Sequence, residues 1–222
     1  MTSAPRKRVA VFISGGGSNM LALAKACEAA DFPAEIVAVL SDKPEAGGLA
    51  KAKALGIPAL AFERRAYGSK AEHEAAILAA LAEIKPDIIC LAGYMRLVSA
   101  DFIRPYEGRM INIHPSLLPN FPGLHTHQRA LEAGHAQAGC TVHFVTEGMD
   151  EGPVIVQMTV PVEAGDTAET LAARVLTVEH RAYPLALKLL AEGRVAMVEG
   201  RTRFADEAAA RAANGRLSDL NQ

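Results

Sequence analysis

The chain has 222 residues, of which half are hydrophobic and 22% are charged, and its formal net charge is −2. This length suits one large α/β domain, and the composition permits both a buried core and a polar surface. The absence of a long basic block argues against nucleic-acid binding, and no run approaches the ~20 apolar residues of a membrane span. Three cysteines without a Cys-x-x-Cys pair indicate reduced thiols. We therefore expect a cytoplasmic protein that binds neither nucleic acid nor membranes.

The first half of the chain alternates strand and helix signals. Short apolar runs rich in β-branched residues predict strands at 8–14, 35–41, 58–62 and 87–93. Helical segments are predicted between and after the first three strands, at 19–30, 46–56 and 70–84. Gly56 suits the position just after a helix, and Ser69 suits an N-cap. This order predicts a parallel sheet of the doubly wound, Rossmann-like type, with helices on both faces.

The pattern changes in the second half. A strand ending near His114 leads into a proline-rich loop at 114–125, and two strand-like runs follow at 140–145 and 153–162. These runs predict one antiparallel strand in the C-terminal half, followed by a long helix over 167–191. We expect a single domain over residues 1–204 and an Ala-rich C-terminal tail over 205–222.

Doubly wound sheets bind ligands beyond the carboxyl ends of their strands, where the strand order reverses. The candidate segments are therefore those that follow each predicted strand. They are 14–19, 41–43, 93–98, 112–119 and 146–152.

A glycine-rich turn follows the first predicted strand, in the stretch VFISGGGSNM. Backbone N–H groups at such a strand-to-helix turn bind anions. Gly15, Gly17 and Asp42 fit part of the dinucleotide pattern, but Met20 occupies the third glycine position, and no P-loop lysine follows. The turn favours a substrate phosphate monoester over NAD, with a tight turn that binds nothing as the remaining alternative.

The strongest chemical signal is the stretch MINIHPSLLP. Asn112 and His114 are two residues apart on a strand and therefore project from the same face. An amide donor and a titratable imidazole at a strand end are suited to stabilising an oxyanion and moving a proton. Asp150, in the loop TEGMDEGP, is a candidate partner for the imidazole. A histidine buried for structural reasons and an asparagine that caps a turn are the alternative.

Histidines gather in this part of the chain, which raises the question of a metal site. Five of the seven lie between residues 114 and 143. His125 and His127 could share a face, with Asp150 or Glu151 adding a carboxylate, but no compact ligand spacing is present, so we expect no metal. His143 faces either the site, as a supporting residue, or the core.

Five segments together resemble the glycinamide ribonucleotide transformylases, folate-dependent enzymes of purine biosynthesis. They are ISGGGSNM, LAGYMRLVS, NIHPSLLPNFPGLHTHQRALEAG, TVHFVTEGMDEGPVIVQ and RVLTVEHRAYP, and they cover most of residues 8–190. The Asn-x-His pair with a downstream Asp is shared by formyltetrahydrofolate transferases and hydrolases. The HPSLLPNFPGLHTH and SGGGSN stretches are specific to the glycinamide ribonucleotide branch.

The resemblance implies transfer of a formyl group from 10-formyltetrahydrofolate to the amine of glycinamide ribonucleotide (GAR), without a metal, by a monomer or a homodimer. Its catalytic residues correspond to Asn112, His114 and Asp150. Its GAR-binding residues correspond to Gly17, Ser18, Asn19 and Glu179. Its folate-binding residues correspond to Lys70, Met95, Arg96, Leu97, Val98, Asn112, Thr146, Glu147, Gly148, Met149 and Asp150.

Three positions depart from the family pattern. The turn reads Gly-Gly-Gly where Gly-Asn-Gly is common, and Leu176 replaces a polar residue. Lys70 stands where an arginine often meets the folate, which keeps the charge but loses the bidentate fork.

Two kinds of rival function stand beside this interpretation, one within the same family and one from a different class. A formyltetrahydrofolate deformylase usually carries an N-terminal regulatory domain, and a methionyl-transfer-RNA formyltransferase needs a C-terminal RNA-binding domain; the sequence leaves room for neither. A nicotinamide-dependent oxidoreductase would depend on Gly15, Gly17 and Asp42.

Overall fold

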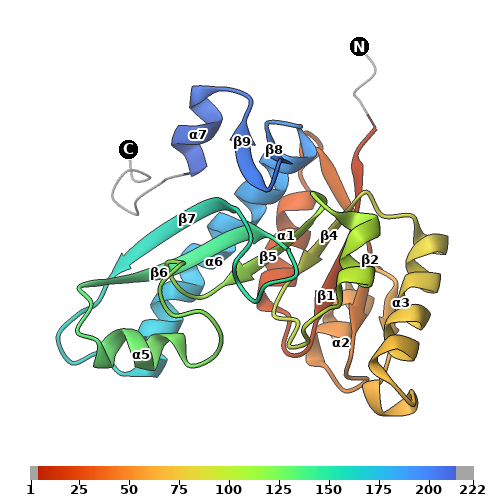
Figure 1. The fold of residues 1–222 in the computed structure, drawn as a ribbon, viewed down its shortest axis with the longest axis horizontal. Coiled ribbons are helices and arrows are strands. Elements are labelled where there is room, and N and C mark those ends of the chain that lie inside the picture. Colours follow the sequence, from red (N-terminus) through yellow and green to blue (C-terminus); the bar gives the residue numbers. More distant parts are fainter. Residues whose placement is uncertain (1–4, 214–222) are drawn as a thin grey trace. The chain divides into compact units, whose positions relative to one another are not determined.

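The computed structural model describes residues 5–213 (Figure 1). Its main sheet has seven strands in the order β3-β2-β1-β4-β5-β6-β7. The strands are β1 (Lys7–Ile13), β2 (Ala34–Ser41), β3 (Ala59–Ala61), β4 (Ile88–Leu91), β5 (Met110–His114), β6 (Gln137–Phe144) and β7 (Val154–Pro161). The pairs β1–β2, β1–β4 and β2–β3 are parallel, whereas β6–β7 is antiparallel. The predicted fold class, a mostly parallel sheet with one antiparallel strand in the C-terminal half, is confirmed.

The helices mostly fall where the sequence predicts them. They are α1 (Ser18–Cys27), α2 (Gly47–Ala54), α3 (Lys70–Ile84), α4 (Ala100–Ile103), α5 (Thr126–Glu132), α6 (Ala168–Ala191) and α7 (Glu207–Ala213), with short 3-10 turns η1 (Arg64–Ala66) and η2 (Arg104–Tyr106). Ser69 caps α3 by accepting a hydrogen bond from the Glu72 N–H at 3.1 Å. Gly56 follows α2 with a φ of +73°, the left-handed conformation that glycine adopts without strain. Both predicted helix ends are therefore confirmed.

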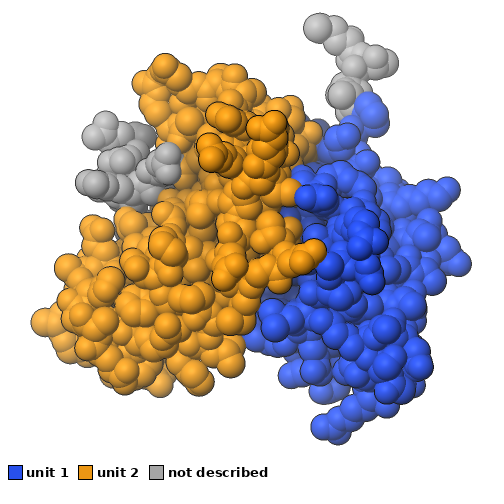
Figure 2. All heavy atoms as spheres, in the orientation of Figure 1, with its two compact units in different colours: residues 1–111 blue, residues 112–222 orange. Residues whose placement is uncertain are grey.

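Two compact units make up the chain, residues 1–111 and 112–222 (Figure 2). In the first unit, β1 is a buried strand from Val9 to Ile13, and it lies between β2 and β4. Helices α1 and α2 contact each other and β2, and α3 contacts α4 and η1. The single domain expected over 1–204 stays a prediction.

In the second unit, the 24-residue helix α6 packs along β6 and β7 (Figure 1). Its buried face includes Leu171, Val175, Ala182 and Tyr183. Thr167 starts the helix with a reciprocal capping box to Thr170, which satisfies backbone donors of the first turn.

A small antiparallel hairpin, β8 (Val195–Val198) and β9 (Arg201–Phe204), was not predicted from the sequence. β8 is an apolar run of only four residues and β9 contains two arginines, so neither strand has a strong sequence signal. Thr202 of β9 donates a hydrogen bond to the Val154 carbonyl of β7 at 2.7 Å. Helix α7 contacts β7, β9 and α6, so the first part of the predicted Ala-rich tail is an ordered helix; residues 214–222 lie outside the described part.

The strand order reverses between β1 and β4, because the chain continues from β1 to one side of the sheet and later returns on the other. At such a point two adjacent loops separate and leave room for a ligand. The loops involved follow β1, with the glycine turn, and β4, with residues 92–99. No helix within residues 5–213 is long and apolar enough to cross a membrane.

Candidate functional site

The second unit brings together the two predicted catalytic side chains that could share a proton. The Nδ1 atom of His114, at the end of β5, lies 3.4 Å from Asp150 Oδ2. Both side chains are nearly buried, at 7% and 11% exposure. A carboxylate in this position stabilises a positively charged imidazole, and the low exposure limits screening by water.

Both ring nitrogens of His114 face hydrogen-bond acceptors. Its Nε2 atom lies 2.9 Å from the carbonyl oxygen of Phe121, and its Nδ1 atom faces the Asp150 carboxylate. A neutral ring carries only one N–H, so it would turn a lone pair toward one of these oxygens. Only a ring with a proton on each nitrogen donates to both oxygens at once.

Asn112 is oriented by His143, which lies on the neighbouring strand β6. The Nδ1 atom of His143 lies 2.8 Å from the Phe144 carbonyl, so it carries the proton and leaves Nε2 as an acceptor. The Asn112 amide donates to that Nε2 at 3.2 Å, which keeps its second amide hydrogen available for a ligand. Burial lowers the pKa of His143, although the Phe144 carbonyl and Asp150 oppose this effect. His143 therefore supports the site as a neutral acceptor, one of the two roles considered from the sequence.

The loop after β5 forms hydrogen bonds with Asp150 and His114. The N–H of Gly123 donates to Asp150 Oδ2 at 2.8 Å, and the Phe121 carbonyl accepts from His114. Phe121 and Asp150 both have positive φ values, 54° and 58°, which is uncommon for residues other than glycine. These constrained conformations concentrate around the imidazole–carboxylate pair, as strained backbone does at functional sites. No side-chain pattern in the sequence predicts the role of the Phe121 carbonyl, because it is a main-chain atom.

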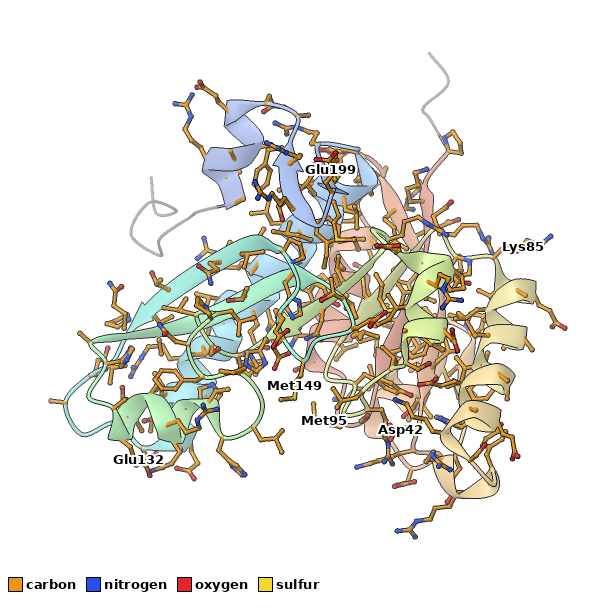
Figure 3. All side chains as sticks on the ribbon, in the orientation of Figure 1. Asp42, Lys85, Met95, Glu132, Met149 and Glu199 are labelled. Carbon is orange, nitrogen blue, oxygen red and sulfur yellow. The ribbon has the colours of Figure 1, made fainter. Side chains whose placement is uncertain are left out.

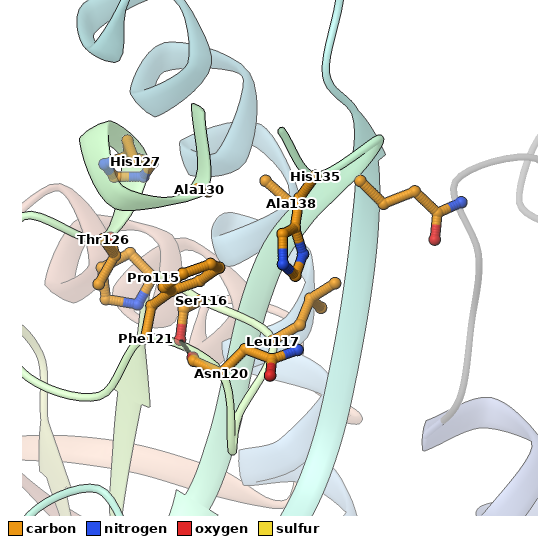
Figure 4. Close-up of a pocket in the computed structure, with 11 residues that line it drawn as sticks. Pro115, Ser116, Leu117, Asn120, Phe121, Thr126, His127, Ala130, His135 and Ala138 are labelled. Atoms are coloured by element: carbon orange, nitrogen blue, oxygen red, sulfur yellow. Dashed lines mark hydrogen bonds between the residues drawn. The ribbon is translucent and has the colours of Figure 1, made fainter. Parts of the chain in front are cut away.

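A small pocket lies against the proline-rich loop (Figure 4). Its lining includes Pro115 and Phe121 from the loop and His127 and Ala130 from α5. Burial lowers the pKa of His127, and the nearby His114 lowers it further. At about 10 Å³ the pocket has room for roughly one water molecule, so it is too small for a substrate.

In the first unit, the glycine turn forms the start of α1. Gly17 is the N-cap residue and has φ 71° and ψ 33°, in the left-handed region. A Cβ atom there would lie 2.9 Å from the Cα of Gly48 in α2, so both the conformation and the close packing require glycine. Ser18 and Asn19 occupy the first helical positions, where backbone N–H groups lack intrahelical acceptors. Lys51 of α2, which the sequence did not single out, donates to the Gly16 carbonyl at 2.8 Å.

Asp42 has a different role from the one a dinucleotide would need. Its Oδ1 accepts from the Ser14 hydroxyl at 2.5 Å, and its Oδ2 accepts from Arg96 Nε at 2.7 Å. The Ser14 hydroxyl also accepts from the Met95 N–H at 2.8 Å. Asp42 therefore joins the loops that follow β1, β2 and β4, and its side chain is 0% exposed, so it is out of reach of a ribose hydroxyl. This contact set was not foreseen from the sequence, where Ser14 was read only as the end of a strand.

The predicted folate-binding residues of the first unit lie on or beside one cavity of about 200 Å³. Lys70, Arg96, Leu97 and Val98 line it, whereas Met95 does not belong to the lining. Met95 and Leu97 are 62% and 63% exposed, so two large apolar side chains lie at the surface on or beside the cavity. Lys70 Nζ lies 3.7 Å from Glu74 Oε1.

The remaining predicted residues belong to the second unit. Thr146, Glu147, Gly148 and Met149 form the loop between β6 and β7, and Met149 is half exposed (Figure 3). Glu179 is buried on α6. The residues that the structure describes contain no group of three or more histidine, cysteine, aspartate or glutamate side chains arranged to hold a metal.

An α/β fold that carries an amide donor and an imidazole–carboxylate pair at the end of a central strand is typical of enzymes that stabilise an oxyanion and move a proton. Comparison with known proteins agrees. The formyl transferase family matches residues 7–187, and the chain belongs to this family.

Relatives of known name are similar over most of the chain. Phosphoribosylglycinamide formyltransferase of Escherichia coli (strain K12) is 44% identical over 86% of this chain and 90% of its own length. A crystal structure of phosphoribosylglycinamide formyltransferase from Brucella melitensis is 70% identical, with a TM-score of 0.82 over 84% of this chain and 96% of that one. The trifunctional purine biosynthetic protein adenosine-3 of Drosophila pseudoobscura pseudoobscura is 49% identical over 87% of this chain. The chain spans only 14% of the length of that larger relative.

Proposed function

We propose that the chain transfers the formyl group of 10-formyltetrahydrofolate to the amine of GAR, giving formyl-GAR and tetrahydrofolate in purine biosynthesis. The single observation that carries this proposal is the grouping of Asn112, His114 and Asp150 around one strand end, where His143 Nε2 accepts from Asn112 and lies 3.8 Å from Asp150 Oδ1. The names of the relatives support the choice of substrates. The cytoplasmic location and a monomeric or homodimeric state remain predictions.

The amine nitrogen of GAR attacks the formyl carbon, a C–N bond forms, and negative charge develops on the formyl oxygen. The free amide hydrogen of Asn112 and the positive charge of His114 stabilise this oxyanion. Because both nitrogens of His114 already face acceptors, its direct donation to the formyl oxygen requires that oxygen to take the place of the Phe121 carbonyl.

Asp150 then accepts a proton from the attacking nitrogen, directly or through a water molecule. The bond between the formyl carbon and N10 breaks, N10 takes up the proton that Asp150 accepted, and tetrahydrofolate leaves. The reaction involves neither a covalent enzyme intermediate nor a change of oxidation state. Asp150 also keeps His114 charged. It therefore has two roles: it accepts the proton of the amine, and through His114 it helps to stabilise the oxyanion.

Substrate binding is assigned to the same segments as in the sequence-based prediction. We assign the GAR phosphate to the turn of Gly17, Ser18 and Asn19, where α1 begins with a residue in the left-handed conformation. Glu179 is assigned to the ribonucleotide. The folate is assigned to the cavity and loop residues Lys70, Met95, Arg96, Leu97, Val98, Asn112, Thr146, Glu147, Gly148, Met149 and Asp150.

Tetrahydrofolate release from 10-formyltetrahydrofolate, followed by absorbance with and without GAR, tests the proposal. We expect release only when GAR is present, together with formyl-GAR detected by mass spectrometry. Equal release in both reactions, with free formate as the product, would instead identify a deformylase. Tight NAD binding without folate binding would favour the oxidoreductase, although the contacts of Asp42 speak against it.

A further inference from the structure

Three lysine and arginine side chains line the cavity of the first unit, one more than the family resemblance implies. Besides Lys70 and Arg96, its wall includes Arg64 of η1, and apolar side chains such as Ile77 and Phe102 complete it. Arg64 belongs to a segment, 63–67, that no motif in the sequence singled out.

Two of these cations already have carboxylate partners. Arg96 pairs with the buried Asp42 at 2.7 Å, and Lys70 lies 3.7 Å from Glu74. Glu74 is itself held by Ser99, whose backbone N–H donates to Oε1 at 3.0 Å and whose hydroxyl donates to Oε2. The carboxylates on and beside the cavity are therefore committed to structural contacts.

Arg64 differs from both. Its Nη1 donates to the Tyr67 carbonyl at 3.0 Å, across the 3-10 turn, which fixes the direction of the guanidinium. It has no ion pair with any carboxylate of residues 5–213, so Nη2 and Nε remain as two donors for an anion. A guanidinium presents such donors in a planar fork that matches a carboxylate.

From this geometry we propose that Arg64 binds a carboxylate of the glutamate tail of the folate co-substrate, and that it supplies the fork that Lys70 cannot provide. The inference rests on the proposed function, since it takes the folate as the occupant of the cavity. It makes Arg64 a residue that determines specificity for acidic-tailed folates and not a catalytic residue.

The test compares two formyl donors that differ only in this tail, 10-formyltetrahydrofolate and 10-formyltetrahydropteroate, which lacks the glutamate. For Arg64→Ala we expect KM for the glutamate-bearing donor to rise ~10-fold, in line with one charge-assisted contact, with kcat and the KM for GAR unchanged. KM for the pteroate donor should stay the same. For Arg64→Lys we expect a KM for the glutamate-bearing donor between those of the wild type and Arg64→Ala, because lysine keeps the positive charge but loses the planar fork of donors.

Arg65→Ala is the matched control, because Arg65 is the exposed neighbour that does not line the cavity. An equal KM increase for both donors, or an equal effect of Arg65→Ala, would overturn the inference, since it would indicate a structural or bulk-charge role. An unchanged KM for Arg64→Ala would overturn it too.

Equilibrium binding of 5-formyltetrahydrofolate separates this inference from the proposed function. If the wild-type protein binds this compound without catalysing transfer, the proposed function fails but the inference can still be tested. Weaker binding of the compound to Arg64→Ala would then support the inference, and equal binding would overturn it. If the wild-type protein binds no folate, both fail.

Discussion

The Asp150 carboxylate and the His114 imidazole are joined through one oxygen atom that also holds the neighbouring loop. Oδ2 lies 3.4 Å from His114 Nδ1 and accepts from the Gly123 N–H at 2.8 Å. The Phe121 carbonyl, from that same loop, accepts from the other ring nitrogen. The loop of residues 121–123 therefore contacts both the imidazole and the carboxylate, so its position depends on the Asp150 side chain.

The first prediction concerns Asp150→Asn. An amide can still accept from Gly123 and tolerates the positive φ of 58°, so we expect the fold to remain intact. The amide cannot keep His114 charged or accept a proton, and formyl transfer should fall by ~10²–10³-fold or more. Steady-state kinetics and thermal unfolding check the two halves of this expectation.

Glu151→Gln, at the adjacent exposed carboxylate, is the control and should retain activity within about twofold. Near-wild-type activity of Asp150→Asn would remove Asp150 from the mechanism.

The second prediction compares two glycines of the turn. Gly17→Ala places a Cβ atom 2.9 Å from the Gly48 Cα in a left-handed conformation, and should lower the free energy of unfolding by ~1–2 kcal/mol and weaken GAR binding. Gly15→Ala meets nothing within 4 Å and should change stability by less than ~0.5 kcal/mol. Urea denaturation and the KM for GAR are the measurements. Equal free energies of unfolding and equal KM values for GAR in the two variants would contradict the close packing of Gly17 against Gly48.

The third prediction concerns Asp42→Ala. It leaves Ser14 and Arg96 without their acceptor, and the loss of a buried acceptor costs about 1–3 kcal/mol. The loop at Met95, which is tied to Ser14, should loosen, and KM for the folate should rise while KM for GAR stays the same. Urea denaturation and steady-state kinetics measure the two effects.

Asp101→Ala provides the matched control for Asp42→Ala, because the Asp101–Arg104 pair is 82% and 74% exposed. Exposed pairs contribute little, so its stability should change by less than ~0.5 kcal/mol. A comparable loss in both variants would show that Asp42 has no special role.

The fourth prediction is a dependence of stability on pH. Burial lowers the pKa of His180 below its ordinary value of about 6.5, as it does for His127 and His143. In the window just below pH 6.5 the unfolded chain binds more protons at these positions, so the free energy of unfolding should fall as the pH falls. His180→Gln should reduce that dependence between pH 7.5 and 5.5, measured by urea denaturation.

His135→Gln, at an exposed histidine, serves as the control for this measurement and should leave the slope close to that of the wild type. A slope unchanged by His180→Gln would contradict the assignment of this pH dependence to the partly buried His180.

Much of the fold could be predicted from local sequence signals. The strands β1, β2 and β4 are mostly apolar and rich in β-branched residues, and the start of α3 and the end of α2 carry a serine and a glycine whose roles are local. The hairpin β8–β9 could not be predicted, because its strands have four residues each and little burial.

The candidate site divides in the same way. Asn112 and His114 were found because a spacing of two residues on a strand fixes their common face. The roles of the Phe121 carbonyl and of Ser14 depend on contacts between residues distant in sequence or on main-chain atoms, and no side-chain pattern reports these. The contacts of Asp42, which the sequence analysis considers only under the nicotinamide alternative, could not be predicted for the same reason.

The close approach of Gly17 and Gly48 has a consequence for recognising such turns in other chains. A Cβ atom at Gly48 would lie 2.5 Å from the Ile13 side chain and 3.1 Å from the Gly17 Cα, so the turn tolerates no larger residue on either side. The signature of this turn is therefore bipartite: it joins SGGGSN to a glycine about thirty residues downstream, at the start of a separate helix. A search pattern that includes both parts should reject many glycine-rich stretches that match the first part by chance.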